Sequence, residues 1–253
     1  MTSIRLDGKR VLITGASRGI GADLAESFAE AGATLVLSGR DAEALDVQAR
    51  KLRERFGIRA EAVAADLSEP EAPRRLAAAA AAVFGGLDVL INNAGISHPE
   101  PVTALTAEAF DEVLTVNLRA PALLAAEIGS AMAESGGGSL VTIASAAALH
   151  PLTEHYAYST SKAGIVMATR VLALELGPRG VRANSLCPTV VLTDMGRKVW
   201  GEEAKSAPML ARIPLGRFAV PAEVSATALF LASDLSSMIN GTEIPIDGGY
   251  GVS

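Results

Sequence analysis

The stretch RVLITGASRGIG, residues 10–21, decides the fold of this chain. Its first five residues form a short apolar run, typical of a strand buried on both faces. Gly15, Gly19 and Gly21 then lead into a helical pattern near residues 20–31. Such glycines let the backbone approach a pyrophosphate, and free N–H groups at a helix start attract anions. A dinucleotide site is therefore predicted here, the alternative being a turn that only packs helix on strand.

The same alternation of strand and helix continues to the end of the chain. Repeated strand–helix units predict an α/β fold, a single domain over residues 1–253. We expect a Rossmann-like, doubly wound parallel sheet of about seven strands with helices on both faces, and ligands at the carboxyl ends of the strands. Further strands are predicted at 34–38, 60–64, 88–92, 139–143, 181–186 and, more weakly, 242–246, where Pro245 suits an edge; helices are predicted near 42–56, 70–84, 107–134, 157–176 and 221–232.

Composition narrows the classes of partner and compartment. The net charge is −6 and no basic run occurs, so nucleic acid is not an expected partner. The N-terminus lacks the apolar region of a signal peptide, and no apolar stretch approaches the roughly 20 residues that span a bilayer. The single Cys187 fits a reducing, cytoplasmic location and is expected to be a small buried hydrophobe. No His, Cys and Asp cluster has metal-ligand spacing, so no metal is predicted.

The end of the second strand bears on the choice of dinucleotide. An acid there binds the ribose 2′-OH of NAD, but this chain has Arg40, with Arg18 close by in the glycine turn. Two guanidinium groups favour a 2′-phosphate, and hence NADP(H) over NAD(H). Asp41 is either a displaced acid or, as we favour, the cap of the next helix. Asp66 and Gly95, after later strands, either meet the cofactor or serve only as turn residues.

A proton-transfer device is predicted from the stretch YSTSK, residues 158–162. Tyr158 and Lys162 lie four residues apart in a helical pattern, so they share one helix face. A nearby ammonium is expected to lower the pKa of the phenol, which then exchanges a proton with a carbonyl or alcohol. Ser145 ends an earlier strand and can stabilise charge on the substrate oxygen. The alternative is an ordinary solvated Tyr–Lys pair.

Together these motifs resemble the short-chain dehydrogenase/reductase family over almost the whole chain. The resemblance rests on TGASRGIG (14–21), NNAG (92–95) and YSTSK (158–162). It implies a catalytic tetrad of Asn117, Ser145, Tyr158 and Lys162, in which the asparagine holds a water of a proton relay. The cofactor-binding set taken from motif and resemblance is Gly15, Ser17, Arg18, Gly19, Ile20, Gly21, Arg40, Asp66, Leu67, Asn93, Ala94, Gly95, Tyr158, Lys162, Pro188, Val191 and Thr193.

One departure points to a branch of that family. The family usually has Pro-Gly after the sixth strand, whereas this chain has Pro188-Thr189 in CPTVVLTDM, residues 187–195. This is similar to the L-xylulose (dicarbonyl) reductase and tetrameric carbonyl reductase branch, which implies a homotetramer. In that branch the residue at His155 lines the substrate pocket beside Ser145 and Tyr158; a surface loop residue is the equal alternative. Residues 194–215, which include Trp200, are expected to form a helical substrate lid.

The sequence thus predicts an NADP(H)-dependent oxidoreductase. The resemblance implies a small dicarbonyl, ketose or polyol as substrate, with L-xylulose and xylitol leading. A 3-oxoacyl thioester (acyl-carrier-protein) reductase is an alternative, although the acidic chain does not suggest an acidic carrier as partner. A non-catalytic dinucleotide-binding regulator is a third reading, and the retained tetrad argues against it.

Overall fold

A parallel sheet runs through residues 4–253, the part of the chain that the computed structural model describes. Its strands coincide with the predicted ones, and most are buried on both faces, as their continuous apolar runs indicate. In the described residues there are seven of them: β1 Arg10–Thr14, β2 Thr34–Gly39, β3 Ala60–Ala64, β4 Val89–Asn92, β5 Gly138–Ile143, β6 Val181–Pro188 and β7 Glu243–Ile246.

The strand order is β3-β2-β1-β4-β5-β6-β7, and every neighbouring pair is parallel. The order reverses between β1 and β4, which confirms the doubly wound sheet and marks the place where such folds bind ligands. Pro245 lies in β7 at the edge of the sheet, where a missing N–H is tolerated.

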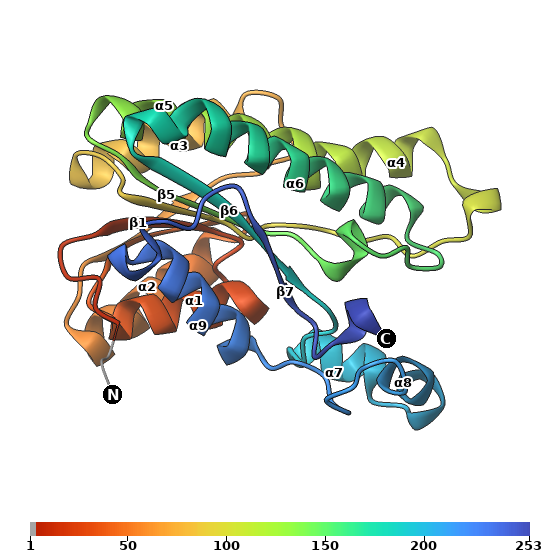
Figure 1. Ribbon diagram of the computed structural model, residues 1–253. Coiled ribbons are helices and arrows are strands. Elements are labelled where there is room, and N and C mark those ends of the chain that lie inside the picture. The colour runs from red at the N-terminus through yellow and green to blue at the C-terminus, as the bar shows by residue number, and fades with distance from the viewer. Residues whose placement is uncertain (1–3) are drawn as a thin grey trace.

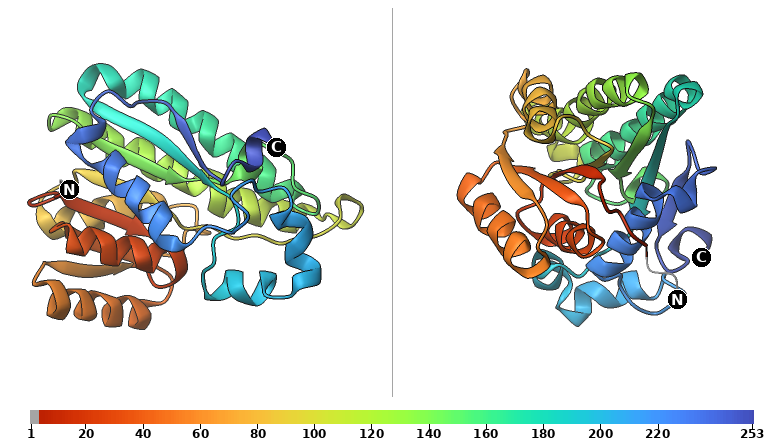
Figure 2. Two further views of the ribbon diagram at one scale, coloured as in Figure 1. Left: turned by 60° about the horizontal axis from the view of Figure 1, so that its bottom comes forward. Right: turned by 90° about the vertical axis from the view of Figure 1, so that its left-hand side faces the viewer.

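Helices cover both faces of the sheet (Figures 1 and 2). Side chains of successive strand residues point to opposite faces, so Val11 and Ile13 join one core cluster and Leu12 joins the other. One layer contains α1 Gly19–Glu30, α2 Ala42–Phe56 and α9 Pro221–Ala232; the other contains α3 Ala72–Phe84, α4 Ala107–Leu114, α5 Ala120–Glu134 and α6 Tyr156–Leu176. Across residues 4–253 no helix has both the length and the apolar character to cross a bilayer.

The prediction of one regular helix over 107–134 was wrong. A π-helical turn, Thr115–Arg119, separates α4 from α5. Such a turn adds a residue to the helical repeat and commonly marks a functional site. It buries Asn117, whose side-chain amide bonds the backbone of Ile96, a contact that periodicity within the helix cannot reveal.

Two short helices, α7 Asp194–Trp200 and α8 Glu203–Leu210, form the segment predicted as a lid. They lie below the carboxyl end of β6 and close to the C-terminus (Figure 1). The Trp200 ring packs on Phe218 with ring centroids 5.7 Å apart, so the single tryptophan is anchored against its own chain.

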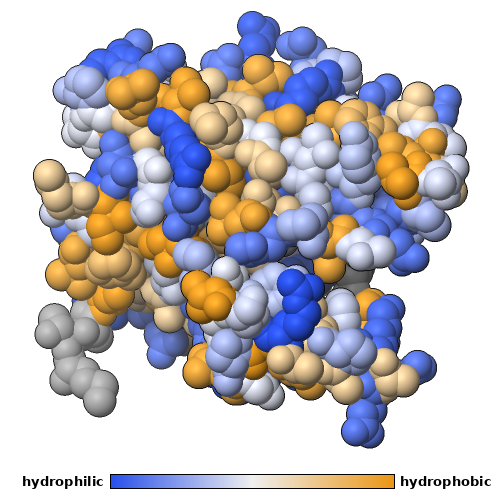
Figure 3. Space-filling view, turned by 45° about the vertical axis from the view of Figure 1, so that its right-hand side comes forward, coloured by the Kyte–Doolittle hydropathy of each residue, from blue (hydrophilic) through white to orange (hydrophobic). Residues whose placement is uncertain are grey.

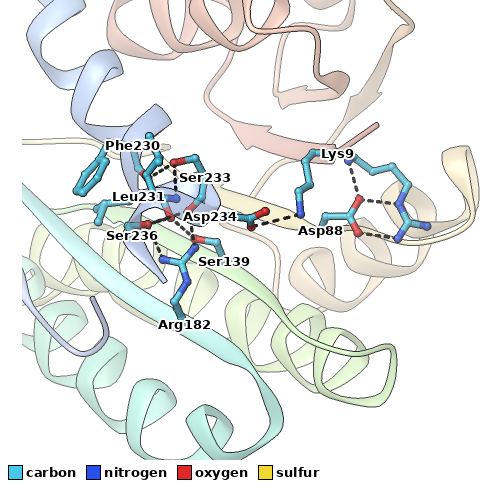
Figure 4. A network of polar contacts seen from close by, with 11 residues as sticks. Lys9, Asp88, Ser139, Arg182, Phe230, Leu231, Ser233, Asp234 and Ser236 are labelled. Carbon is cyan, nitrogen blue, oxygen red and sulfur yellow. Dashed lines mark hydrogen bonds and ion pairs between the residues drawn. The ribbon is translucent and has the colours of Figure 1, made fainter. Parts of the chain in front are cut away.

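Polar contacts hold together the amino ends of the strands, which lie at the other end of the sheet from the carboxyl ends (Figure 4). Asp88 receives two hydrogen bonds of 2.9 Å from the guanidinium of Arg10, which joins the starts of β4 and β1. The guanidinium of Arg182 in β6 donates to Ser236 Oγ at 2.8 Å and to the Ser233 carbonyl at 3.1 Å. The amino ends of the strands are therefore occupied by stabilising contacts, whereas the carboxyl ends remain available for ligands.

Candidate active site

The predicted site residues gather at the carboxyl edge of the sheet. Because every strand pair is parallel, the residues that follow the strands share this edge. The space-filling view shows the surface indented here, between the body and the smaller part beneath it (Figure 3). The strands β1 to β6 contribute, in chain order, Gly15, Arg40, Asp66, Gly95, Ser145 and Pro188.

The turn between β1 and α1 has the shape of a phosphate cradle. Gly15 and Gly19 have φ angles of 66° and 59°, a backbone conformation that favours glycine. A side chain at Gly21 would collide with the Gly15 carbonyl. Arg18, the N-cap of α1, makes no side-chain cap bond, so the first N–H groups of the helix are left for a ligand.

Thr14 is a site residue that sequence reasoning missed. Its hydroxyl accepts hydrogen bonds from the backbone N–H of Asn93 and Ala94, at 3.0 and 3.1 Å. The Asn93 side chain in turn donates to the Thr14 carbonyl at 2.9 Å. NNAG therefore clamps the glycine turn to β4, and the Asn93 side chain supports the cradle. Both motifs are in the sequence, but only the sheet order shows that they are neighbours.

The end of β2 presents Arg40, an exposed side chain. Asp41 accepts a hydrogen bond from the Ala44 N–H at 3.0 Å, which confirms its interpretation as the cap of α2. Asp66 accepts one from the Ser68 N–H at 2.9 Å, so it does serve as a turn residue. The hydrogen bonds from Ser68, and to a lesser extent the charge of Arg40, lower the pKa of Asp66.

Tyr158 and Lys162 share one face of α6, as their spacing predicts. The Lys162 Nζ lies 5.7 Å from the centre of the Tyr158 ring and donates to the Ile143 carbonyl, at the end of β5, at 2.9 Å. Lys162 is 5% exposed, which excludes the alternative of an ordinary solvated pair. Ser145 follows β5, and its hydroxyl interacts with the phenol.

The expectation that Lys162 lowers the pKa of the phenol was wrong for this structure. Burial raises the pKa of Tyr158, and the interaction with Ser145 offsets only part of that rise. Burial also lowers the pKa of Lys162 to about 8, because it penalises the ammonium. Desolvation therefore dominates both groups, and the ammonium at 5.7 Å does not outweigh it.

Asn117 is held in the π-helical turn by its side chain. Its Oδ1 accepts from the Ile96 N–H and its Nδ2 donates to the Ile96 carbonyl, both at 2.8 Å. A Cβ at Gly95 would lie 3.3 Å from Asn117 Oδ1 and 3.5 Å from Lys162 Nζ. The NNAG glycine therefore meets two members of the predicted tetrad, and the backbone there comes close to both.

The residues after β6 lie against the glycine turn. Thr193 caps α7 by accepting a hydrogen bond from the Gly196 N–H at 3.1 Å. A Cβ at Gly19 would lie 3.5 Å from the Thr193 methyl group, which places the start of α7 beside the start of α1. Val191 is buried and pairs with Ala219. The predicted lid thus begins at the predicted cofactor site.

His155 lies directly beside the phenol. Its ring meets that of Tyr158 edge-on, with centroids 5.9 Å apart, and its Nδ1 is 2.8 Å from the Thr153 carbonyl. Glu154, just before it, has φ of 63°, the only positive φ of a non-glycine residue in the described chain. A strained residue next to a reactive group is a common feature of functional sites.

Cys187 in β6 is fully buried behind these groups. Burial raises the pKa of its thiol to about 11, so the thiol is protonated and unreactive, as predicted for a small hydrophobe. Within residues 4–253, no group of three or more His, Cys, Asp or Glu side chains is arranged to hold a metal ion.

The comparisons with known proteins agree with this geometry. A family model of short-chain dehydrogenases, described as enoyl-(acyl carrier protein) reductase, matches residues 15–251. The chain belongs to the short-chain dehydrogenase/reductase family. The match covers the glycine turn, the NNAG segment and the Tyr–Lys pair.

Two curated relatives and one solved structure show the range of similar proteins. D-threitol dehydrogenase of Mycolicibacterium smegmatis is 43% identical, over 97% of this chain and 94% of its own. L-xylulose reductase of Bos taurus is 39% identical, over 98% of both chains. A protein from Beutenbergia cavernae, described as an NAD(P)-dependent gluconate 5-dehydrogenase and crystallised with NADP at low occupancy, is 38% identical with a TM-score of 0.94 over all of both chains. This short-chain dehydrogenase/reductase is therefore an oxidoreductase of the alcohol–carbonyl class.

Proposed function

We propose that this short-chain dehydrogenase/reductase interconverts a small ketose or dicarbonyl and the matching polyol or alcohol, with NADP(H) as cofactor. One observation carries the proposal: Tyr158 and Lys162 share one face of α6, Lys162 is buried and Tyr158 partly buried, and Ser145 lies beside the phenol. A partly buried phenol next to a hydroxyl is suited to exchange a proton with a carbonyl oxygen.

The cradle at α1 fits a dinucleotide. Side chains are excluded at Gly15 and Gly21, and the first N–H groups of α1 are free to bind the pyrophosphate. Arg40 and Arg18 are exposed beside the ribose position, while Asp41 is committed to capping α2. This charge pattern supports NADP(H), although Asp66 partly balances Arg40.

Each residue of the proposed catalytic tetrad has its own part in the reaction. A bound nicotinamide supplies hydride to the carbonyl carbon in reduction and accepts it in oxidation. Tyr158 donates its phenolic proton to the carbonyl oxygen as that oxygen gains charge, and Ser145 donates a hydrogen bond to the same oxygen. The ammonium of Lys162 favours the phenolate that forms. Asn117 fixes the loop that carries Gly95.

The substrate class follows from the relatives, whose names specify D-threitol and L-xylulose. We propose L-xylulose and xylitol as the leading pair, with His155 contributing a polar group to the pocket. The test is NADPH oxidation with L-xylulose, diacetyl, an acetoacetyl thioester and an enoyl thioester. We expect turnover of L-xylulose or diacetyl with the highest kcat/KM. A preference for either thioester would overturn the proposed substrate class.

Cofactor choice is tested by Arg40→Asp. Replacing the guanidinium with a carboxylate removes a partner of the 2′-phosphate and creates one for a 2′-OH, so the ratio of kcat/KM for NADPH to that for NADH should fall by roughly 10- to 100-fold. Asp41→Ala is the matched control, since it should weaken the cap of α2 without changing the ratio. An unchanged ratio in Arg40→Asp would contradict the proposal of NADP(H).

We further propose that the protein forms a homotetramer and is located in the cytoplasm. Leu123 in α5 and Met167, Val171 and Leu174 in α6 expose apolar side chains at helical spacing. Near the C-terminus, Met238 and Val252 are almost fully exposed. Two separate apolar surfaces on one chain are what a tetramer with two kinds of interface requires. Light scattering should give a mass of about four chains; a monomer would contradict this part.

A further inference from the structure

Ser161 lies in α6 between the two reactive residues and has no role in the mechanism above. It is fully buried. Its hydroxyl donates to the Tyr158 carbonyl at 2.7 Å and accepts from Asn117 Nδ2 at 3.2 Å. One hydroxyl therefore connects the backbone of the predicted acid to the π-helical turn on the neighbouring helix.

The orientation of the Asn117 amide is determined by its contacts. Oδ1 accepts from the Ile96 N–H, so the other end of the amide must be the NH₂ group. One N–H binds the Ile96 carbonyl, and the second reaches Ser161. Both donors are used, and the amide has no free N–H to turn toward a substrate.

We propose that Ser161 is a positioning residue, which fastens the first turns of α6 to Asn117 and so holds Tyr158 at its working place between Ser145 and Lys162. The inference rests on the proposed function. Ser161 does not touch the reacting atoms; it acts through the Tyr158 backbone. The chain from Ile96 through Asn117 and Ser161 to Tyr158 also explains why a π-helical turn occurs at this point.

A neighbouring serine provides a matched comparison. Ser159 lies in the same helical turn, and its buried hydroxyl has no hydrogen-bond partner within the described part of the chain. Loss of the Ser159 hydroxyl therefore removes no contact. Loss of the Ser161 hydroxyl releases the Tyr158 carbonyl and leaves an Asn117 N–H buried without a partner, which is the costly case.

The test compares Ser161→Ala, Ser161→Thr and Ser159→Ala. For Ser161→Ala we expect kcat to fall by roughly 3- to 10-fold, the equivalent of one buried neutral hydrogen bond, with KM within about twofold. The pH at which alcohol oxidation reaches half its maximum should also move upward, because a displaced phenol is less well supported by Ser145 and Lys162. Ser161→Thr keeps the hydroxyl and should restore kcat and the pH profile, while Ser159→Ala should behave as wild type.

The following outcomes would overturn the positioning role or the proposed function. Wild-type kcat and pH profile in Ser161→Ala, or equal damage in the Ala and Thr variants, would overturn the positioning role. If Ser161→Ala does not fold, Ser161→Cys keeps the size with a weaker hydrogen bond and should show the same fall in kcat; wild-type kcat in that variant would overturn the role. Failure of the wild type to turn over any carbonyl substrate is different, because it would overturn the proposed function itself.

Discussion

Among individual residues, burial is the main influence on the pKa values of Tyr158 and Lys162, the two proposed catalytic groups. It raises the pKa of Tyr158 and lowers that of Lys162, so each neutral form is favoured in the protein. A protonated phenol is the form needed to reduce a carbonyl. The lysine, with a pKa of about 8, is mostly charged at neutral pH and can stabilise the phenolate when it forms.

Tyr158→Phe tests the proposed proton donor directly. The ring remains to fill its partly buried site, but the hydroxyl is lost, so kcat should fall by about 100- to 10,000-fold. Cofactor affinity, measured by fluorescence titration with NADPH, should stay within about threefold of wild type, because the glycine cradle and arginines are untouched. Substantial turnover in this variant would remove Tyr158 from its role. The half-exposed Tyr156, replaced by Phe, is the control.

Lys162→Met tests how much the buried ammonium lowers the free energy of unfolding. The pKa of Lys162 falls from 10.5 to about 8 on folding, so the unfolded chain binds more protons between these values and stability rises with pH there. Below pH 8 the buried charge costs up to about 3 kcal/mol relative to the neutral amine. The variant should lose activity yet resist urea better at pH 7, and this gain should vanish near pH 10.5. A variant less stable at pH 7 would contradict the expectation.

At the level of elements, the glycine turn and the π-helical turn are the two local devices that shape the site. The first makes room for a cofactor between β1 and α1, and the second places Asn117 against the NNAG loop. Each depends on a contact between segments far apart in the sequence. Thr14 and Asn93 are 79 residues apart, and Asn117 and Ser161 are 44 apart.

Gly21→Ala tests the cradle. Its Cβ would meet the Gly15 carbonyl, so the turn must shift, and affinity for NADPH should fall at least about tenfold, equivalent to 1.4 kcal/mol. Gly57→Ala is the control, because a Cβ there meets open space and only the left-handed backbone is strained, at a cost of roughly 1–2 kcal/mol in stability. Isothermal titration gives both affinities. Equal affinity in Gly21→Ala and wild type would show that the turn does not hold the cofactor.

These contacts also decide what the sequence could predict. The strands and the shared face of Tyr158 and Lys162 follow from short-range patterns, and the order reversal follows from the repeated strand–helix units; all are found. The π-helical turn could not be predicted, because the apolar repeats of α4 and α5 continue on both sides of it. The pKa of Tyr158 was predicted in the wrong direction, since spacing indicates the nearby charge but not the depth of burial.

Across the whole molecule, the carboxyl ends and the amino ends of the strands carry different groups of residues. The carboxyl edge gathers the proposed cofactor and substrate residues, and the amino edge holds the polar network of Arg10, Asp88 and Arg182 (Figure 4). Stability and activity should therefore respond independently to changes at the two edges.

Asp88→Asn tests this independence. The carboxylate receives two hydrogen bonds from the guanidinium of Arg10 and one from its backbone N–H, which lower the pKa of Asp88, and the amide cannot accept all three. The free energy of unfolding should fall by about 1–3 kcal/mol, with kcat and KM unchanged at 25 °C. Urea unfolding and steady-state assays measure the two quantities. A several-fold change in kcat with intact folding would show that the edges are coupled.

The buried Cys187 has a practical consequence for experiments on this enzyme. The chain contains one sulfhydryl, and it is shielded from solvent and protonated at physiological pH. Maleimides and similar reagents should leave the native protein unmodified. A cysteine introduced at an exposed position, such as Val199 in α7, would then be a unique attachment point for a fluorophore that tests whether the predicted lid moves, with no need to remove the natural one.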